Sequence, residues 1–303
     1  MANRPRIVLI GNSGSWHVNQ ILQRCDRRAI GQVVSWPELA ALISDGKERF
    51  LPEAVELADC LLIRGMPAGT LEQVIGRMDM LGRLAAQGRR ILNQPAALEI
   101  AIDKYLATAR LAAAGLPVVP SALVQSAADL DRVRGELGDS LIAKPLFGSN
   151  GRGLCQLAKT GDPPEPLRGQ GAILVQQQIP HEGWDVRILV VGDRTYAMKR
   201  LAPAGDWRTN IALGGQPAPF AAPADWIDLA RKAAAAVGAE LAGVDLLPAT
   251  DGSLWLLEVN AVPGWQALQR VVPDDLAAAV LELALGAEGN LTNVAGKTGA
   301  TAP

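Results

Sequence analysis

The first third of the chain alternates short apolar runs with stretches of helical spacing. Three apolar runs predict buried strands, over residues 7–10, 60–63 and 91–93. Apolar residues recur at helical spacing over residues 71–87, where Gly88 stops the pattern, and a second helical stretch is expected over residues 36–43. Because strands that alternate with helices form parallel sheets, residues 1–93 are predicted to form a small parallel α/β domain.

The rest of the chain combines long helical patterns with paired strands. Helices are expected over residues 96–114, where Gly115-Leu116-Pro117 ends the pattern, and over residues 226–237. Apolar runs predict two strands, over residues 141–145 and 173–177. Two further pairs of runs are separated by short turns and predict hairpins: residues 185–191 with 194–199, and residues 243–247 with 254–260.

Composition limits the class of protein more than it identifies one. The chain has 303 residues, enough for two or three modest domains, with 49% hydrophobic and 20% charged residues. A net charge of −2 argues against a nucleic-acid partner, which would need a clustered basic surface. The cysteines, Cys25, Cys60 and Cys155, are far apart and have neither disulfide nor metal-site spacing. With no signal peptide and no membrane-spanning run, the protein is expected to be cytoplasmic and to have no membrane partner.

A lysine followed by a glycine-rich loop is the strongest local motif. Lys144 lies in the predicted strand 141–145, and Gly148-Ser149-Asn150-Gly151-Arg152-Gly153 follows it. Glycines let backbone N–H groups approach an anion closely, and the lysine adds a positive charge to the same phosphates. The motif is neither a Walker A loop nor a dinucleotide fingerprint, and a flexible hairpin explains the loop alone equally well. Lys104, at the start of a helix, is by itself a surface lysine.

Three oxygen-bearing side chains lie on the two strands of the last predicted hairpin. Glu258 and Asn260 are two residues apart, so both leave the same face of the strand, and Asp245 lies in the partner run. Charges among Leu, Val and Trp are costly unless a cation compensates them, and magnesium prefers oxygen ligands. A magnesium site is therefore favoured over carboxylates exposed at strand ends.

A basic stretch follows the first hairpin. Lys199-Arg200 precede Gly205-Asp206-Trp207-Arg208-Thr209-Asn210, and Arg208 can bind carboxylate or phosphate oxygens bidentately. Asp185 and Arg187 alternate on one face of the preceding strand run and are expected to line the same cleft. In isolation a surface loop with solvated charges explains this stretch better. His17 and His181 lack partners at catalytic spacing, so no catalytic triad is predicted.

The order of these motifs resembles the ATP-grasp superfamily, and more narrowly its RimK-type α-L-glutamate ligase branch. The similarity covers residues 94–285, and the stretch Gly205–Asn210 is especially like that branch. The resemblance implies an ATP-grasp fold preceded by a small parallel α/β pre-ATP-grasp domain, an α/β chain with an α+β C-terminal part. It implies a pre-ATP-grasp domain over residues 1–93, a subdomain with the lysines and glycine-rich lid over 94–178, and a subdomain with the metal site over 179–286. Residues 287–303, small and polar, are predicted to be a disordered tail.

The resemblance also implies roles for single residues. ATP would be bound by the two lysines, the glycine-rich lid and the hinge after the second strand: Lys104, Lys144, Gly148, Ser149, Gly151, Gly153, Gln176, Gln177, Gln178 and Ile179. One or two Mg²⁺ ions, or Mn²⁺ in their place, would be held by Asp245, Glu258 and Asn260. Catalysis would fall to Lys144, Arg208 and Asn210. Substrate carboxylates would be bound by Asp185, Arg187, Lys199, Arg200 and Arg208.

The activity that the resemblance implies is an ATP- and Mg²⁺-dependent carboxylate–amine ligase that adds L-glutamate through an acyl-phosphate. The expected acceptor is a small carboxylate in cofactor biosynthesis, such as a tetrahydromethanopterin, methanofuran or coenzyme F420 precursor. One alternative is a ligase that modifies a protein or peptide C-terminus, as in ribosomal protein glutamylation or LysW-linked lysine and arginine synthesis. Another is an inactive nucleotide-binding regulatory protein. A homo-oligomer, dimeric or tetrameric, is also expected from the family.

Overall fold

The computed structural model describes residues 4–148, 151–158, 164–165 and 171–286. These form two compact units. Unit 1 comprises residues 4–96, 264–266 and 274–286, and unit 2 comprises residues 97–263 and 267–273. Within the described residues, no helix is both long and apolar enough to cross a membrane.

Unit 1 is built on a four-stranded parallel sheet, as the alternating pattern predicted. The strand order is β2-β1-β5-β6, with bounds β1 Arg6–Ile10, β2 Ile30–Val34, β5 Cys60–Ile63 and β6 Arg90–Leu92. Helices α1 (Trp16–Cys25), α2 (Glu53–Glu56) and α3 (Leu71–Ala86) connect the strands. All four residues of β5 are buried, which explains its uninterrupted apolar sequence. The edge strand β2 was not predicted; Gly31 and Gln32 interrupt its apolar sequence, and only Val34 is fully buried.

The helix expected over residues 36–43 is wrong. Only the 3-10 turn η1 (Trp36–Glu38) forms, and the chain continues as a hairpin of β3 (Ala40–Ser44) and β4 (Lys47–Leu51). The turn between them is Asp45-Gly46, with φ angles of 50° and 69°. An Asp-Gly pair accommodates two consecutive left-handed residues at low cost, so it favours a two-residue hairpin turn over a continuing helix.

The last helix, α9 (Leu276–Leu285), belongs to unit 1, although the sequence analysis placed it in the C-terminal subdomain. It packs on α1, where Arg24 pairs with Asp275 at 2.9 Å and Arg28 with Glu282 at 3.1 Å. The apolar sequence of α9 is buried in this contact and against β5. The division of residues 94–286 into two subdomains stays a prediction.

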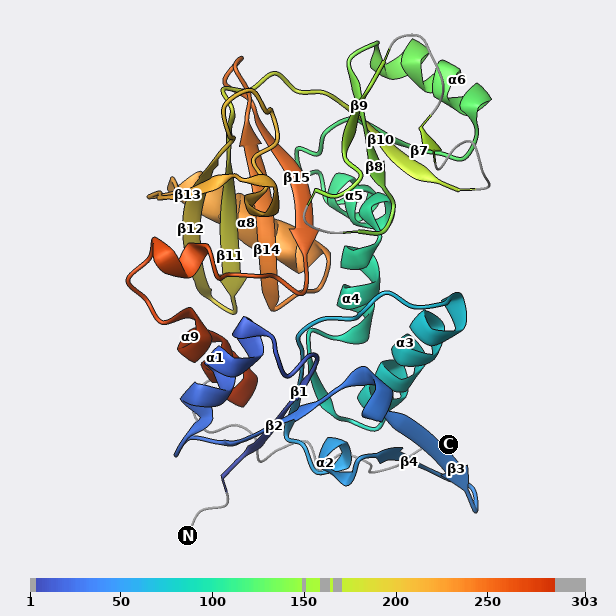
Figure 1. The fold of residues 1–303 in the computed structure, drawn as a ribbon, viewed down its shortest axis with the longest axis vertical. Helices are drawn as coiled ribbons and strands as arrows, with labels where there is room; N and C mark the ends of the chain where they lie inside the picture. The colour runs from blue at the N-terminus through green and yellow to red at the C-terminus, as the bar shows by residue number, and fades with distance from the viewer. Residues whose placement is uncertain (1–3, 149–150, 159–163, 166–170, 287–303) are drawn as a thin grey trace, which may run out of the picture. The chain divides into compact units, whose positions relative to one another are not determined.

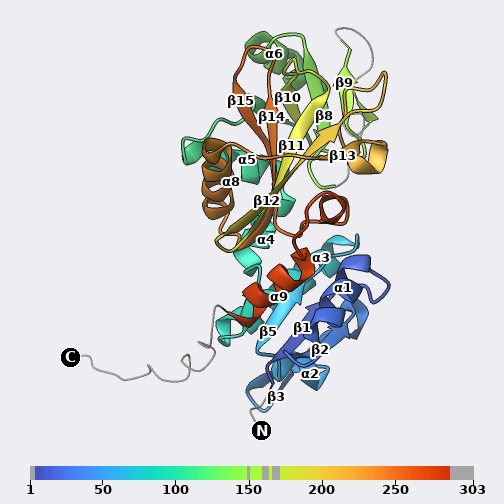
Figure 2. The same cartoon turned by 90° about the vertical axis from the view of Figure 1, so that its left-hand side faces the viewer.

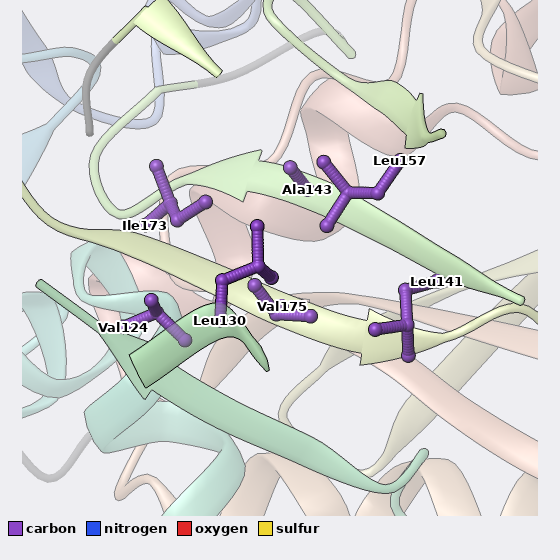
Figure 3. Close-up of a cluster of buried hydrophobic side chains, with 7 residues drawn as sticks. All are labelled: Val124, Leu130, Leu141, Ala143, Leu157, Ile173 and Val175. Atoms are coloured by element: carbon purple, nitrogen blue, oxygen red, sulfur yellow. The ribbon is translucent and has the colours of Figure 1, made fainter. Parts of the chain in front are cut away.

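The first part of unit 2 is a four-stranded antiparallel sheet in the order β7-β10-β8-β9. Its strands are β7 Ser121–Val124, β8 Leu141–Pro145, β9 Cys155–Leu157 and β10 Ile173–Gln177. Helix α6 (Ala127–Leu137) covers one face of this sheet, where Leu130 lies among Leu141, Ala143 and Val175 (Figure 3). Because side chains alternate along a strand, Ile142 and Lys144 leave the opposite face of β8.

The helical pattern over residues 96–114 is divided into two helices. α4 (Pro95–Ile102) and α5 (Lys104–Ala113) are separated by Asp103. The Asp103 carboxylate accepts hydrogen bonds from the backbone N–H groups of Tyr105 and Leu106, so it caps α5. This cap makes Lys104 the first residue of α5.

The second part of unit 2 is a five-stranded antiparallel sheet, labelled in Figures 1 and 2, in the order β13-β12-β11-β14-β15. Its strands are β11 Trp184–Val191, β12 Arg194–Leu201, β13 Gln216–Pro219, β14 Leu241–Pro248 and β15 Leu254–Asn260. Helix α8 (Ala224–Ala236) packs against β11 and β14, and short turns η2 (Ile211–Leu213) and η3 (Leu268–Arg270) complete the unit. Both predicted hairpins form. The register places Asp245 opposite both Arg187 on β11 and Glu258 on β15.

Candidate active site

A cavity in unit 2 collects residues from both of its antiparallel sheets and from the loop over residues 203–210. Its apolar lining comes from Val119, Ile142, Leu154, Ile179, Leu247 and Leu257. Its polar lining contains most of the predicted site residues: Lys104, Lys144, Gly148, Gly151, Gln176, Gln177, Gln178, Asp185, Arg200, Arg208, Asn210, Asp245 and Glu258. Apolar walls beside a dense group of charges suit a ligand with a ring and a polyanionic part.

Two lysines enter the cavity from different elements. Lys144 leaves the inner face of β8, and Lys104 at the start of α5 donates a hydrogen bond from Nζ to the carbonyl oxygen of Gly148 at 2.6 Å. Burial lowers the pKa of Lys144 to about 8, with Glu258 opposing the shift and Lys104 adding to it. Because the burial of this cation is only partly compensated, an anionic ligand would stabilise its protonated form.

The glycine-rich loop meets the far side of the cavity at a position where no side chain fits. Gly151 has φ +70°, and a Cβ atom there would lie 2.6 Å from Oδ1 of Asn210. Gly153 has φ +73°, and its Cβ would lie 2.6 Å from the side chain of Pro145, so this glycine packs against β8 rather than lining the cavity. Ser149, predicted to bind phosphate, lies outside the described residues. The backbone of the loop therefore approaches the ligand space closely.

A chain of buried ion pairs joins β11, β12 and β14. Arg200 donates from Nε and Nη2 to the two carboxylate oxygens of Asp185 at 2.7 and 2.6 Å, and its Nη2 also lies 2.9 Å from Oδ2 of Asp245. Arg187 donates to both oxygens of Asp245, and Thr209 donates to Asp185 at 2.6 Å. Opposite charges therefore alternate along this network, in the order Asp185, Arg200, Asp245 and Arg187.

The network shifts the pKa values of Arg200 and Asp245 towards their charged forms. Burial alone would lower the pKa of Arg200, but Asp245 and Asp185 outweigh it and raise that pKa. Burial alone would raise the pKa of Asp245, but Arg187 and Arg200 lower it. Arg200 and Asp245 thus both keep their charges in the interior of the unit, which is the condition under which buried ion pairs persist.

The donor set for a divalent cation consists of Asp245 and Glu258, which are cross-strand partners and both line the cavity. Two carboxylates that share the ion with substrate phosphates are what Mg²⁺ commonly uses, so these residues fit the ion. In the described part of the chain, no cluster of three or more His, Cys, Asp or Glu residues forms a metal site. Asn260, the third predicted ligand, accepts a hydrogen bond from the backbone N–H of Val262 at 2.8 Å and does not line the cavity.

The basic residues predicted to bind substrate do not all face the cavity. Arg208 and Asn210 line it, and Arg208 is held by Asp206 at 2.8 Å. Lys199 lies elsewhere, with Nζ 3.7 Å from the ring centre of Trp184. It alternates with Arg200 along β12, so only Arg200 leaves the cavity face of the strand. The guanidinium of Arg187 donates to the carboxylate of Asp245 and does not line the cavity.

Sequence reasoning missed His181, Trp207 and all of the apolar lining except Ile179. His181 lines the cavity, and its Nδ1 accepts a hydrogen bond from the backbone N–H of Gly183 at 3.2 Å. Burial lowers its pKa, with Asp185 opposing the shift. A signal for part of the lining was present in the strand pattern, since Ile142 alternates with core residues on the same strand as Lys144.

Solved structures with the same architecture establish the class of fold. The ATP-grasp ligase PsnB complexed with its minimal precursor, Mg and ADP has a TM-score of 0.73 over 94% of this chain and 98% of that one, at 19% identity. A RimK domain protein ATP-grasp from Sphaerobacter thermophilus has a TM-score of 0.67 over 93% of this chain and 100% of that one, at 21% identity. The chain has an ATP-grasp fold.

The sequence comparison identifies the family. The model of the RimK-like ATP-grasp domain matches residues 101–284, and the chain belongs to this family. Tetrahydromethanopterin:alpha-L-glutamate ligase from Methanosarcina acetivorans is 35% identical over 205 residues, 62% of this chain and 63% of that protein. Ribosomal protein bS6–L-glutamate ligase from Salmonella paratyphi B is 35% identical over 199 residues, 63% of this chain and 66% of that protein. In both cases the match spans less than two thirds of the relative.

Proposed function

We propose that the protein is an ATP- and Mg²⁺-dependent carboxylate–amine ligase that joins L-glutamate to a carboxylate acceptor. The observation that carries this proposal is the joint lining of one cavity by two lysines, a glycine-rich loop, two cross-strand carboxylates and Arg208. Apolar residues beside these charges suit a nucleoside triphosphate, with the base on the apolar side and the phosphates against Lys104 and Lys144. Mg²⁺, held by Asp245 and Glu258, would screen the phosphate charge.

The reaction needs an activated carboxylate, because a carboxylate resists attack by an amine. Transfer of the γ-phosphoryl group of ATP to the acceptor gives an acyl-phosphate, and attack by the α-amine of glutamate then releases phosphate. This route forms no covalent bond with the protein, so the protein contributes by positioning the substrates and stabilising charge. Lys144 and Arg208 would stabilise the transferring group, and Asn210, which lies against the loop at Gly151, would orient it.

The names of the two relatives support glutamate and leave the acceptor as the main question. Both relatives are named as L-glutamate ligases, one acting on tetrahydromethanopterin and the other on ribosomal protein bS6. We favour a small cofactor-type acceptor because a net charge of −2 gives no overall electrostatic attraction to a ribosomal partner. A dimer or tetramer, expected from the family, can be tested by light scattering of the purified protein.

The deciding experiment follows nucleotide products formed by the purified protein with ATP, Mg²⁺ and L-glutamate. One arm adds a small-molecule extract of the source cells, and a matched arm adds the protein fraction of the same extract. ADP and phosphate that appear only with glutamate and the small-molecule arm support the proposal, and mass spectrometry then identifies the acceptor. Turnover only with the protein fraction supports the protein-modifying alternative. Formation of AMP and pyrophosphate contradicts the acyl-phosphate route.

A further inference from the structure

Thr209 is a nearly buried residue in the loop over residues 203–210. It is only 7% exposed, and its two neighbours in the chain, Arg208 and Asn210, line the cavity with it. A hydroxyl buried in this way normally has a hydrogen-bond partner, so the partner shows what the residue does. The Thr209 hydroxyl donates to Oδ2 of Asp185 at 2.6 Å.

This hydrogen bond joins the loop to the sheet. Asp185 is the second residue of β11 and is only 1% exposed. In the described part of the chain, no other hydrogen bond joins residues 203–213 to a strand. The bonds between Arg208 and Asp206, at 2.8 to 3.2 Å, lie within the loop, so they shape it without attaching it to the sheet.

The acceptor of this hydrogen bond is itself held firmly. Asp185 pairs in register with Arg200 on β12 and receives two hydrogen bonds from its guanidinium. The same guanidinium lies 2.9 Å from Asp245, one of the two carboxylates proposed to hold Mg²⁺. Through Asp185, Arg200 therefore fixes the position of the loop relative to Asp245.

The backbone of the loop is closed immediately after the two cavity-lining residues. A Cβ atom at Gly215 would lie 2.1 Å from the carbonyl oxygen of Thr209, so only glycine fits there. The N–H of Gly215 donates to the carbonyl oxygen of Asn210 at 3.1 Å. The loop is therefore compact by itself, and the Thr209 side chain attaches this compact loop to β11.

We propose that Thr209 is a positioning residue, which holds Arg208 and Asn210 at the cavity through its hydrogen bond to Asp185. The inference rests on the proposed function in one respect, that Arg208 and Asn210 act on the transferring phosphoryl group. It goes further in assigning their alignment to a neighbouring side chain. A misplacement of about 1 Å can lower the rate of a reaction by about 10²-fold, so one hydrogen bond that fixes a loop can control turnover.

The test uses Thr209→Val, which keeps the shape of the side chain and removes the hydroxyl. Both oxygens of Asp185 keep their bonds to Arg200 in this variant, so no buried charge loses its partner and the fold should persist. Thr209→Ser restores a hydroxyl and is the rescue variant. The matched control is Thr195→Val, which makes the same change on β12 outside the cavity lining.

Amide hydrogen exchange of the full chain without ligand, followed by mass spectrometry, reports on the loop directly. The N–H groups of Arg208 and Gly215 are hydrogen-bonded within the closed loop, so they exchange faster when it opens. Peptides that cover residues 203–215 should exchange about tenfold faster in Thr209→Val and close to the wild-type rate in Thr209→Ser. Peptides from α8 should be unchanged in every variant, which separates opening of the loop from a general loss of stability.

Turnover is measured as ADP formation with ATP, Mg²⁺, L-glutamate and the small-molecule extract. In Thr209→Val we expect kcat to fall about 10- to 100-fold while KM for ATP stays within about twofold, because the groups that bind the nucleotide are unchanged. Thr209→Ser should recover most of kcat, and Thr195→Val should equal the wild type. A residue that only stabilised the fold would not produce this difference between kcat and KM.

Unchanged hydrogen exchange of the loop in Thr209→Val, or a wild-type kcat, overturns the inference and leaves the proposed ligase intact. A rise in KM for ATP of about tenfold with unchanged exchange would mean that Thr209 binds the nucleotide itself, which also overturns it. No ADP formation by the wild type with either fraction of the extract overturns the proposed function and the catalytic part of this inference together. The exchange measurement tests the attachment of the loop by itself, so the two failures are distinguishable.

Discussion

Lys144 and Arg200 are two basic side chains that line one cavity, yet their surroundings shift their pKa values in opposite directions. Burial lowers the pKa of Lys144 to about 8, because Glu258 and Asp245 compensate it only partly and Lys104 opposes them. The pKa of Arg200 is raised, because Asp185 and Asp245 lie within hydrogen-bond distance and outweigh its burial.

The difference indicates that the two sides of the cavity have different roles, one structural and one in binding a ligand. The Arg200 side is neutralised by its own ion pairs, so it forms a framework that holds Asp245 in place before any ligand arrives. The Lys144 side lacks part of its compensation, so the charge of a bound anion would complete it. A buried cation that is only partly neutralised favours the binding of a polyanionic ligand such as a triphosphate.

The largest effect should follow from breaking the neutralised side. Arg200→Met leaves Asp185 and Asp245 buried without their shared partner, and the loss of one member of a buried ion pair costs about 3–5 kcal/mol of unfolding free energy. Chemical denaturation measures this loss. The matched control is Lys232→Met on α8, which breaks an exposed pair with Asp228 and should cost about 0.5 kcal/mol or less.

A near-wild-type stability for Arg200→Met would contradict the framework role. It would mean that Asp185 and Asp245 do not need Arg200 as their shared partner, and the two sides of the cavity would then not differ as described.

The second effect concerns activity rather than stability. Lys144→Ala and Glu258→Ala should each lower kcat/KM for ATP-dependent ligation by about 10²–10³-fold, because each removes charge directed at the phosphates or their cation. The melting temperature should stay close to that of the wild type. Lys199→Ala is the matched control, since Lys199 lies on β12 outside the cavity and its removal should leave turnover unchanged. Normal turnover in Lys144→Ala would reject the site assignment.

Strand patterns predicted the site-bearing elements well where the signal was local. Strands β8 and β15 have the predicted bounds, and Lys144 on β8 and Glu258 on β15 both line the cavity. The hairpin through Asp251-Gly252 brings Asp245 opposite Glu258, as the turn residues indicated. These inferences needed only a period of two and a turn of known chemistry.

Other features depended on pairings between distant segments, which a single sequence does not encode locally. Arg187 was predicted to bind substrate, but the pairing of β11 with β14, more than fifty residues apart, sets it against Asp245. Lys199 was grouped with Arg200 because they are adjacent, although adjacency in a strand places them on opposite faces. A helix was predicted over residues 36–43, and the Asp45-Gly46 turn that makes residues 40–44 one strand of a hairpin was not considered.

A pH titration sharpens the comparison further. Nucleotide affinity should fall about tenfold between pH 7 and pH 9, because Lys144 loses its proton near pH 8 in the free protein and an anionic ligand raises that pKa. Calorimetry of nucleotide binding across this range measures the change. In Lys144→Arg the side chain stays charged throughout, so the affinity should vary much less with pH. A wild-type affinity that does not change would mean that Lys144 is already fully compensated, like Arg200.

The smallest effect is on the pH dependence of stability and concerns unit 1. There His17 lies beside Arg64, a third buried basic group. Arg64 lies 4.4 Å over the ring of Trp265, and Nε2 of His17 accepts a hydrogen bond from the backbone N–H of Trp265 at 2.9 Å. Burial, and then the charge of Arg64, lower the pKa of His17 to about 4. In the unfolded chain His17 has a pKa near 6.5, so it takes up a proton at a higher pH than in the folded protein. The free energy of unfolding therefore decreases between pH 6.5 and pH 4 and levels off below.

Because His17 is partly exposed, we expect this free energy to fall by only about 1 kcal/mol. Urea unfolding at several pH values measures the loss, and His17→Gln should remove this part of the slope while His181→Gln retains it. An identical slope in His17→Gln would mean that burial and the charge of Arg64 do not keep His17 neutral in the folded protein.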